Sequence, residues 1–396
     1  MLSQRQLFLN YVGQTSDFPL ELEILSAKGI YMFGRKGEKY IDLISGIGVS
    51  NVGHRHQRVI GAIQRQLRKY LHLMVYGEFV QSPQARLAKA IVDTLPKSLD
   101  NVFFVNSGSE AIEGAMKLAK RFTGRTEIIS CHRAYHGSTH GALSIGGGEE
   151  YKNNFRPLLP DVKQIHFGVE KELEKISIKT AAFVIETVQG EAGVRTATQP
   201  YFEAIRKRCD ETGTLLIMDE IQCGVGRTGR LWAFEHYGIV PDIVTIAKGM
   251  GGGMPIGAFI SSQEIMSVLK NNPILGHITT FGGHPVCCAA SLATFQVIQK
   301  EKLLDEVERK AQLFKDLLVH SSILSIRNKG LMMAVEFESF NLLKKVIDQA
   351  IKNGVLTDWF LYCDNSMRIA PPLIITEKEI KKACKLILKS IDEVTG

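Results

Sequence analysis

The stretch Leu215–Glu220, which reads LLIMDE, decides the fold class. Four apolar residues followed at once by two carboxylates are typical of a buried strand of a parallel sheet. Similar apolar runs recur from about residue 50 to residue 290, and helical patterns such as Glu110–Phe122 and Tyr201–Thr212 separate most of them. These runs are Val102–Val105, Glu127–Ser130, Ala182–Ile185, Ile243–Ile246 and Gly257–Ile260. The alternation predicts an α/β fold with a mostly parallel sheet covered by helices.

The two ends of the chain have a different pattern. Residues 1–45 are predicted to be irregular except for a hairpin at Gly29–Tyr40. After residue 290 the expected elements are helices at Ser291–His320, 341–353 and 377–393, and strands at Leu331–Phe337 and Met367–Ile369. We therefore expect a large domain over residues 46–290. A smaller α+β domain would combine residues 291–396 with residues 1–45.

The composition fits a folded protein of two or three packed lobes. Of 396 residues, 45% are hydrophobic and 22% are charged, so global disorder is excluded. Lys+Arg 48 less Asp+Glu 41 leaves a net charge of +7, which suits a small anionic ligand. Because basic runs with interleaved aromatics are missing, we expect no nucleic-acid partner.

Seven cysteines without a CxxC pair predict reduced thiols in a cytoplasmic protein, with neither disulfides nor a metal site. The start, MLSQRQLFLN, lacks the apolar core of a signal peptide. No apolar run approaches the roughly 18 residues of a membrane span, so we expect no membrane partner.

Two loops have the composition of phosphate sites. Asn106–Ala111, NSGSEA, follows a predicted strand and opens a predicted helix, and Ser107 and Glu110 have the spacing of a capping box. The free N–H groups of such a helix start suit a phosphate, although an ordinary helix cap has the same pattern. Thr279–Pro285, TTFGGHP, offers hydroxyls and glycine N–H groups, and it could equally be a plain loop.

Charged side chains stand at two predicted strand ends. Asp219 and Glu220 lie where open α/β sheets bind ligands, so a carboxylate there could hold a cation or a protonated ring nitrogen. Lys248 directly follows the run IVTIA and precedes a glycine-rich loop. Partial desolvation lowers the pKa of such an amine and suits it to Schiff-base formation. A helix cap, a metal-binding Asp and a surface Lys are the alternatives.

Two further motifs could contact a flat, acidic ligand. In Tyr135-His136-Gly137 the aromatic ring could stack on a ligand, or it is simply a half-buried Tyr. Arg368 lies inside an apolar strand and needs a carboxylate partner. That partner is either a substrate or an internal acid such as Glu191.

The run Gly224–Gly229 matches GxGxxG, yet it is not a dinucleotide-binding loop. Five residues separate it from the preceding strand, and RTGR is a poor start for a helix. Lys248 and Gly249 stand where an acidic ribose ligand would be expected. We therefore reject a Rossmann dehydrogenase.

Together these motifs supply the parts needed to bind pyridoxal phosphate: a phosphate cradle, an acid for the ring nitrogen, a Schiff-base lysine, a stacking ring and a carboxylate-binding arginine. The chain resembles the class III aminotransferases, which include the acetylornithine, ornithine and 4-aminobutyrate aminotransferases. The resemblance runs from Gly46–Val49 to Arg368–Pro372 and is most specific at Leu216–Gly229, LIMDEIQCGVGRTG. It implies the fold-type I architecture, with a seven-stranded sheet in the large domain and a small domain from both termini.

The resemblance also implies roles for single residues. Lys248 would carry the Schiff base with pyridoxal 5'-phosphate and shuttle a proton, and Asp219 would pair with the pyridinium nitrogen. The other cofactor contacts would be Gln222 at the 3-oxygen, Ser107, Gly108 and Ser109 at the phosphate, Tyr135 and His136 at the ring, Glu186 near the ring, and Thr280 from the neighbouring subunit. A homodimer with shared active sites is therefore implied.

For the substrates, the resemblance implies a ping-pong transfer from an ω-amino donor, acetylornithine-like or ornithine-like, to 2-oxoglutarate. Arg368 would bind the α-carboxylate of 2-oxoglutarate or glutamate, and Glu191 would pair with Arg368 when the donor presents none. Relatives commonly carry an arginine for a substrate carboxylate where this chain has Ser138. Arg133 could replace it if its side chain turned inward.

Three alternatives remain open from the sequence. An aminomutase or racemase would share Lys248 and Asp219 but would need no 2-oxoglutarate. A decarboxylase on the same scaffold would release carbon dioxide. A non-catalytic binding protein that kept the fold is disfavoured because Lys248, Asp219, Gln222 and Thr280 are all present.

Overall fold

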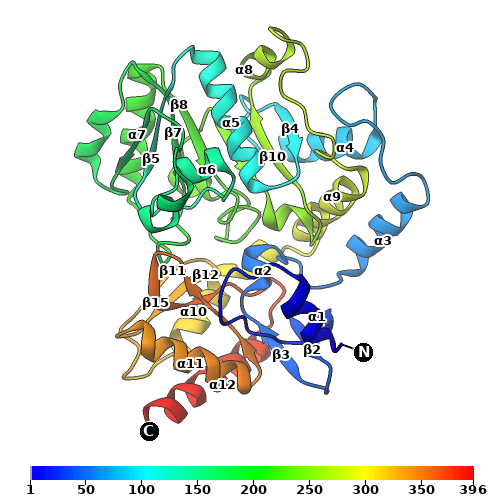
Figure 1. Ribbon diagram of the computed structural model, residues 1–396, viewed down its shortest axis with the longest axis vertical. Coiled ribbons are helices and arrows are strands. Elements are labelled where there is room, and N and C mark those ends of the chain that lie inside the picture. Colours follow the sequence, from blue (N-terminus) through cyan, green and yellow to red (C-terminus); the bar gives the residue numbers. More distant parts are fainter. Residues whose placement is uncertain (1) are drawn as a thin grey trace.

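The computed structural model describes residues 2–396, and a seven-stranded sheet forms its upper part in Figure 1. The strand order is β4 (Asn101–Val105), β10 (Gly257–Ser261), β9 (Ile243–Ile246), β8 (Leu215–Asp219), β7 (Thr180–Glu186), β5 (Glu127–Cys131) and β6 (Val162–Ile165). Strand β10 runs antiparallel to β4 and β9, whereas the other neighbours are parallel. The predicted fold class is confirmed.

The strands are apolar throughout because both faces of the sheet are covered. In β7, Phe183 and Ile185 belong to one buried cluster, which also contains residues of α7 (Gln199–Thr212). Ala182 and Val184 belong to a second cluster, which contains the buried face of α5 (Gly108–Thr123). Since alternate residues of a strand point to opposite faces, the two helices cover opposite sides of the sheet.

Both ends of the chain build the lower part of the molecule (Figure 1). One sheet has the order β1 (Ile24–Lys28), β2 (Tyr31–Gly34), β3 (Lys39–Asp42) and β13 (Val355–Leu356); the other has β11 (Ser325–Lys329), β12 (Met332–Glu336), β15 (Cys363–Ile369) and β14 (Trp359–Phe360). Because β13 pairs in parallel with β3, the C-terminal region is bonded directly to the N-terminal one. The helices of this part are α1 (Gln4–Tyr11), α10 (Val307–Leu317), α11 (Phe340–Lys352) and α12 (Glu377–Thr395).

A group of helices connects the two parts. Helices α3 (Gln57–Leu67) and α4 (Ser82–Val92) both pack against α9 (Pro285–Lys300). The expected boundary after residue 290 falls inside α9, so we propose that the large domain extends to residue 300. Short helices complete the fold: α2 (Ser45–Gly48), α6 (His140–Ser144) and α8 (Gln263–Ser267).

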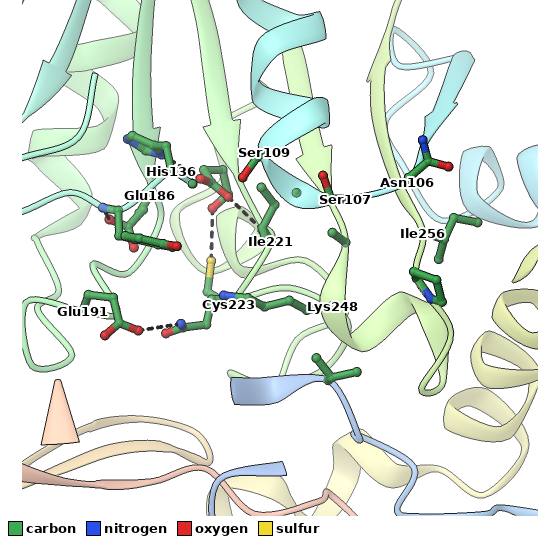
Figure 2. Close-up of a pocket in the computed structure, with 18 of the residues that line it drawn as sticks. Asn106, Ser107, Ser109, His136, Glu186, Glu191, Ile221, Cys223, Lys248 and Ile256 are labelled. Atoms are coloured by element: carbon green, nitrogen blue, oxygen red, sulfur yellow. Dashed lines mark hydrogen bonds and ion pairs between the residues drawn. The ribbon is translucent and has the colours of Figure 1, made fainter. Parts of the chain in front are cut away.

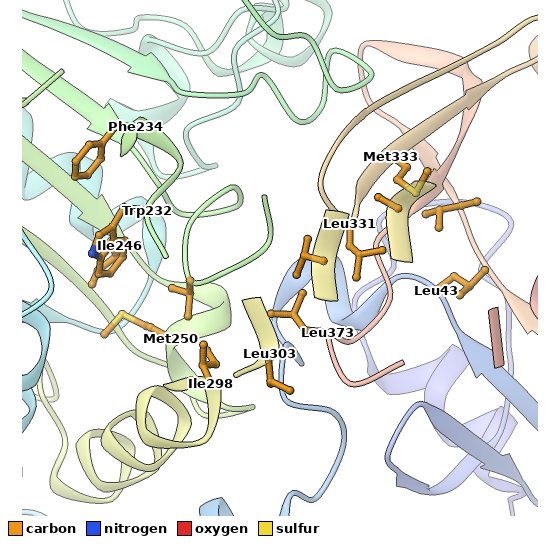
Figure 3. Close-up of a cluster of buried hydrophobic side chains, with 14 of the residues drawn as sticks. Leu43, Trp232, Phe234, Ile246, Met250, Ile298, Leu303, Leu331, Met333 and Leu373 are labelled. Carbon is orange, nitrogen blue, oxygen red and sulfur yellow. The ribbon is translucent and has the colours of Figure 1, made fainter. Parts of the chain in front are cut away.

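One hydrophobic cluster continues from the large sheet into the lower part (Figure 3). Ile246 of β9 and the nearby Met250 lie at one end of it, Ile298 of α9 lies in between, and Leu331 and Met333 lie at the other end. The two parts therefore share a core, and removing one would expose apolar surface of the other.

Some predicted elements differ from the structure. The single helix expected at Ser291–His320 is instead α9 followed by α10, because Lys302 adopts a left-handed backbone conformation, with φ of 49°, that ends the first helix. Helix α1 was missed, although the Ser3–Gln6 capping box at its start is visible in the sequence. Strands β6 and β11 were also missed, since both carry polar residues and are incompletely buried.

Neither a membrane span nor a metal centre is found within residues 2–396. No helix there is both long and apolar enough to cross a bilayer. The same residues form no group of three or more His, Cys, Asp or Glu side chains suited to a metal ion. All seven cysteines are free thiols, and only Cys363 is not fully buried.

Helix α5 approaches the sheet closely, and we predict that a single methyl group will disturb this contact. A Cβ at Gly114 would lie 2.3 Å from Cε1 of the buried Phe259 ring. Gly114→Ala should therefore destabilise the protein by about 1–3 kcal/mol, because a packed aromatic ring cannot yield. The matched control is Gly61→Ala in α3, where a Cβ meets only the flexible end of Arg65 at 3.2 Å. That change should raise stability by up to about 1 kcal/mol. Equal denaturation midpoints for the two variants would contradict the packing interpretation.

Candidate active site

The carboxyl ends of three neighbouring strands meet at one cavity of about 430 Å³. Glu186 ends β7, Asp219 ends β8 opposite it in the register, and Lys248 lies two residues beyond β9. Figure 2 shows Lys248 between Ser107 and Ser109 on one side and Glu191 on the other. The cavity is also lined by the predicted residues Gly108, Tyr135, His136 and Gln222. The structure thus gathers ten of the predicted site residues around one space.

Lys248 is held in a strained conformation beside acids. Its backbone φ of 44° is uncommon for a residue with a side chain, and it begins a short 3-10 helix, Lys248–Gly251. Burial lowers the pKa of the Lys248 amine, while the charges of Glu191 and Asp219 oppose this shift. A lowered pKa makes the neutral, nucleophilic amine more available.

Asp219 is fixed on both of its carboxylate oxygens. Oδ1 accepts a hydrogen bond of 2.9 Å from the Ile221 N–H, and Oδ2 lies 2.7 Å from Nδ1 of His136. Burial lowers the pKa of His136, but the hydrogen bond and the charge of Asp219 outweigh it, so the net shift is upward. His136 is therefore paired with Asp219 and also lines the cavity, and its predicted contact with the cofactor ring stays a prediction. Its Nε2 is buried and lacks a partner in the part of the chain that the structure describes.

The start of α5, where a phosphate cradle is predicted, lines the cavity. Oγ of Ser107 caps the helix by accepting the Glu110 N–H at 3.2 Å. The reciprocal half of the capping box differs from the prediction, because Oε2 of Glu110 accepts the N–H of Asn106 at 2.7 Å. A Cβ at Gly108 would lie 2.9 Å from Ile221, so this position needs glycine. Unpaired N–H groups at this helix start can bind an anion.

Glu186 is buried and is held by the backbone of Tyr135 and of the loop that follows β7. It accepts the N–H of Tyr135 at 3.1 Å and that of Gly190 at 2.9 Å. Burial, with a contribution from Asp219, raises the pKa of Glu186 to about 7. The hydroxyl of Tyr135 lies 3.1 Å from Oγ of Ser138.

Arg368 and Glu191 form the buried pair that the sequence suggested. Nη1 and Nη2 of Arg368 donate to the two carboxylate oxygens of Glu191 at 2.8 and 2.9 Å. Burial would raise the pKa of Glu191, but Arg368 lowers it to about 2. The amide of Gln222 donates to Oε1 of Glu191 at 3.0 Å, so Gln222 links this pair to the cavity.

Three residues that the sequence analysis discussed do not line the cavity: Thr280, Ser138 and Arg133. Thr280 is exposed on the loop before α9. Ser138 is exposed at the cavity's outer side, and its N–H donates to Oγ of Ser109 at 3.3 Å. Arg133 is exposed and lines a separate hollow beside Tyr362, so its side chain does not turn inward. The rejected GxGxxG run, Gly224–Gly229, forms turns and opens no helix.

Sequence reasoning missed Asp358 and Ile221. Oδ1 of Asp358 accepts a 2.9 Å hydrogen bond from Nε of Arg368, on the side away from Glu191. Asp358 lies directly before β14, a two-residue strand that the sequence analysis did not predict, so nothing in the sequence placed it beside Arg368. Ile221 holds Asp219 through its backbone, and nothing in the side-chain pattern signals this.

Comparison with known proteins identifies the family. The sequence profile for aminotransferase class-III matches residues 12–391. The chain belongs to the class-III aminotransferases.

Relatives and solved structures agree with this assignment. Acetylornithine aminotransferases from Methanocaldococcus jannaschii and Methanopyrus kandleri are 38% and 39% identical to this aminotransferase, over 95% and 96% of its length and 94% and 97% of theirs. An ornithine aminotransferase from Toxoplasma gondii, solved with partial occupancy of PLP at its active site, is 32% identical with a TM-score of 0.91. That match covers 98% of this chain and 93% of the other.

The cavity fits pyridoxal phosphate, the cofactor on which this aminotransferase depends. The helix start at Gly108 offers N–H groups that suit a phosphate, Asp219 is a carboxylate fixed by hydrogen bonds that suits a protonated ring nitrogen, and Lys248 lines the same cavity. When bound, the cofactor supplies an aldehyde that condenses with amines and a ring that withdraws electrons.

The His136–Asp219 pair predicts a pH dependence of stability. A pKa raised above 6.5 in the folded state means that the pair's stabilisation is complete below pH 6.5 and is lost as pH rises through the raised value. His136→Asn keeps an amide near the Nδ1 position but cannot take up a proton. The melting temperature of the cofactor-free wild type should therefore fall more between about pH 6 and pH 9 than that of the variant. The exposed His140→Asn should follow the wild type, and parallel curves for all three proteins would contradict this assignment.

Proposed function

We propose that this aminotransferase moves the amino group of an ω-amino donor, acetylornithine-like or ornithine-like, to 2-oxoglutarate by a ping-pong mechanism. The observation that carries the proposal is the buried Arg368–Glu191 pair, in which Glu191 lines the cavity and Arg368 lies directly behind it. A guanidinium whose fork already holds one carboxylate can take another in the same geometry. The two substrates of a ping-pong cycle occupy one site in turn, so the same fork would serve both.

Three of this chain's side chains would then carry the reaction. The Nζ of Lys248, with its lowered pKa, would accept the proton of the reacting carbon and donate it back. Asp219, fixed by Ile221 and His136, would offer its carboxylate to a protonated ring nitrogen. Arg368 orients the acceptor through its α-carboxylate, which keeps the reacting carbon near Lys248.

Glu191 has partners that make an exchange feasible. Besides Arg368, it accepts hydrogen bonds from the Gln222 amide at 3.0 Å and the Leu361 N–H at 3.2 Å. These two donors could satisfy the carboxylate when an acceptor takes its place on Arg368. A donor without a carboxylate at this point would leave the Arg368–Glu191 pair closed, which favours an ω-amine.

The proposal includes a homodimer with shared active sites. Thr280 stands on an exposed loop, and exposed apolar side chains surround this region: Leu71, Leu73, Phe79, Val80, Ile274, Ile278 and Phe281. An apolar surface of this kind is typical of a subunit interface. Across it, Thr280 would contact the cofactor phosphate of the second subunit. The free thiols support a reducing location, the cytoplasm.

The first test is the absorbance of the cofactor-loaded protein in single-turnover experiments without a keto acid. Ornithine, N-acetylornithine, lysine, 4-aminobutyrate, putrescine and glutamate would be mixed with it in turn. We expect glutamate and one ω-amine to convert the cofactor from its aldehyde to its amine form, and 2-oxoglutarate to reverse the change. If no amine converts the cofactor, transamination of these substrates is wrong, and the isomerase and decarboxylase alternatives follow.

The second test removes the amine of Lys248. Lys248→Ala should abolish turnover and change the cofactor's visible absorption, because both depend on Nζ. The control is Lys117→Ala in α5. This change removes an exposed amine that lies beside His277 and does not line the cavity. It should retain the wild-type spectrum and rate. Normal turnover by Lys248→Ala would refute the role given to this residue.

A further inference from the structure

Arg368 is held by more than its pair with Glu191. Three consecutive residues contact the guanidinium: Oδ1 of Asp358 accepts from Nε at 2.9 Å, the Trp359 carbonyl accepts from Nη2 at 3.1 Å, and the ring of Phe360 lies 4.5 Å below Cζ. All three belong to the segment that enters and forms β14, which pairs with the Arg368 strand β15. The guanidinium therefore has one face and one edge fixed before any substrate arrives.

The backbone fixes Asp358 relative to Arg368 as well. The Arg368 N–H donates to the Asp358 carbonyl at 2.8 Å, and the Thr357 hydroxyl donates to the Arg368 carbonyl at 2.6 Å. Asp358 thus cannot drift away from Nε without breaking the pairing of the two segments. Glu191, in contrast, reaches Arg368 from a separate loop and through its side chain alone.

We propose that Asp358 is a positioning residue for the acceptor: by holding Nε, it keeps the Nη1–Nη2 fork of Arg368 in its present orientation toward the cavity-lining position of Glu191 when Glu191 leaves and the acceptor carboxylate takes its place. This inference rests on the proposed function, because it presupposes an acceptor that binds Arg368 through a carboxylate.

Geometry and charge both support this division of roles. A guanidinium has two edges that can each receive a carboxylate, and here Asp358 occupies the Nε edge while Glu191 occupies the fork. Burial raises the pKa of Asp358 to about 6 even though Arg368 opposes the shift, so the side chain is a carboxylate at neutral pH. When Glu191 leaves, Arg368 is therefore not left as an unpaired buried charge. Exchange of one carboxylate for another on the fork then leaves the net charge around Arg368 unchanged.

The experiment compares two changes at Asp358 with a control on the same hairpin. Asp358→Ala removes the acceptor of the Nε hydrogen bond, whereas Asp358→Asn retains an amide oxygen that can accept it. The control is Asp364→Ala, which removes an exposed acid from β15. Each cofactor-loaded protein would be titrated by calorimetry with glutarate, a dicarboxylate that lacks an amino or keto group. The rates of the donor and acceptor half-reactions would be measured separately.

We expect Asp358→Ala to weaken glutarate binding and to raise the KM for 2-oxoglutarate by about tenfold, since one hydrogen bond to a charged group is lost. The donor half-reaction and the kcat of the acceptor half-reaction should change by less than about twofold, because neither depends on reopening the fork. Asp358→Asn keeps an acceptor for Nε but loses the negative charge, so its binding should lie between that of Asp358→Ala and the wild type, and Asp364→Ala should match the wild type. If Asp358→Ala does not fold, Asp358→Ser replaces it, because the serine hydroxyl is too short to reach Nε.

Several results would overturn the inference. Wild-type glutarate binding by Asp358→Ala would show that Nε needs no anchor. Equal losses in both half-reactions, or an Asn variant as weak as the Ala variant, would show a general structural role. If the wild type itself neither binds glutarate nor reacts with 2-oxoglutarate, the proposed function fails along with this inference. That outcome is distinguishable because it appears before any variant is made.

Discussion

The parallel register of β7, β8 and β9 is the constraint on which the site depends. It sets Glu186 opposite Asp219 at the same sheet edge, and the chain leaving β9 brings Lys248 to the same place. Adjacent parallel strands lie about 4.8 Å apart, so such groups cannot avoid one another once the strands pair. The sheet is buried on both faces, which makes this edge a place where charges interact strongly.

Most of the charged groups at this end of the strands have a direct partner. Asp219 has His136 and a backbone N–H, and Glu191 has Arg368, Gln222 and a backbone N–H. Lys248 faces acids without a direct ion pair among the described contacts, which leaves its amine available for chemistry. Asp219 and Glu191 are thus hydrogen-bonded on several sides, whereas Lys248, which we propose to react, has no such partner among the described residues.

A second buried arginine joins the two parts of the molecule around the site. Arg227, on the turn that follows β8, donates to the carbonyls of Leu331 and Pro371 and to the side chains of Ser45 and Asn51. Burial lowers the pKa of its guanidinium to about 10. Since Pro371 lies three residues after Arg368, this network ties the Arg368 strand, β15, to the turn that follows Asp219. The geometry of the cavity therefore depends on contacts between sequence-distant segments.

Much of the fold was predictable because its determinants are local. The runs IVTI and LLIM predicted the central strands within a residue, and the helical patterns Glu110–Phe122 and Tyr201–Thr212 predicted α5 and α7 within two residues at each end. Strand β6, with the sequence VKQI, lies at the edge of the sheet and pairs with β5 alone. It is incompletely buried and carries only two apolar residues, which are too few to predict a strand. The division of Ser291–His320 into two helices depended on the backbone of one residue, Lys302, which its side chain does not signal.

The sequence by itself determined the fold class, the family resemblance and the identity of the residues at the strand ends, because these follow from periodicity and from short motifs. Only the tertiary structure decided how those residues pair. It assigned His136 to Asp219, placed Gln222 on Glu191 and put Asp358 on the second edge of Arg368. These partners come from different segments of the chain, up to 83 residues apart for His136 and Asp219. A hydrogen bond depends on positions in space, and chain folding sets those positions through packing of the whole core.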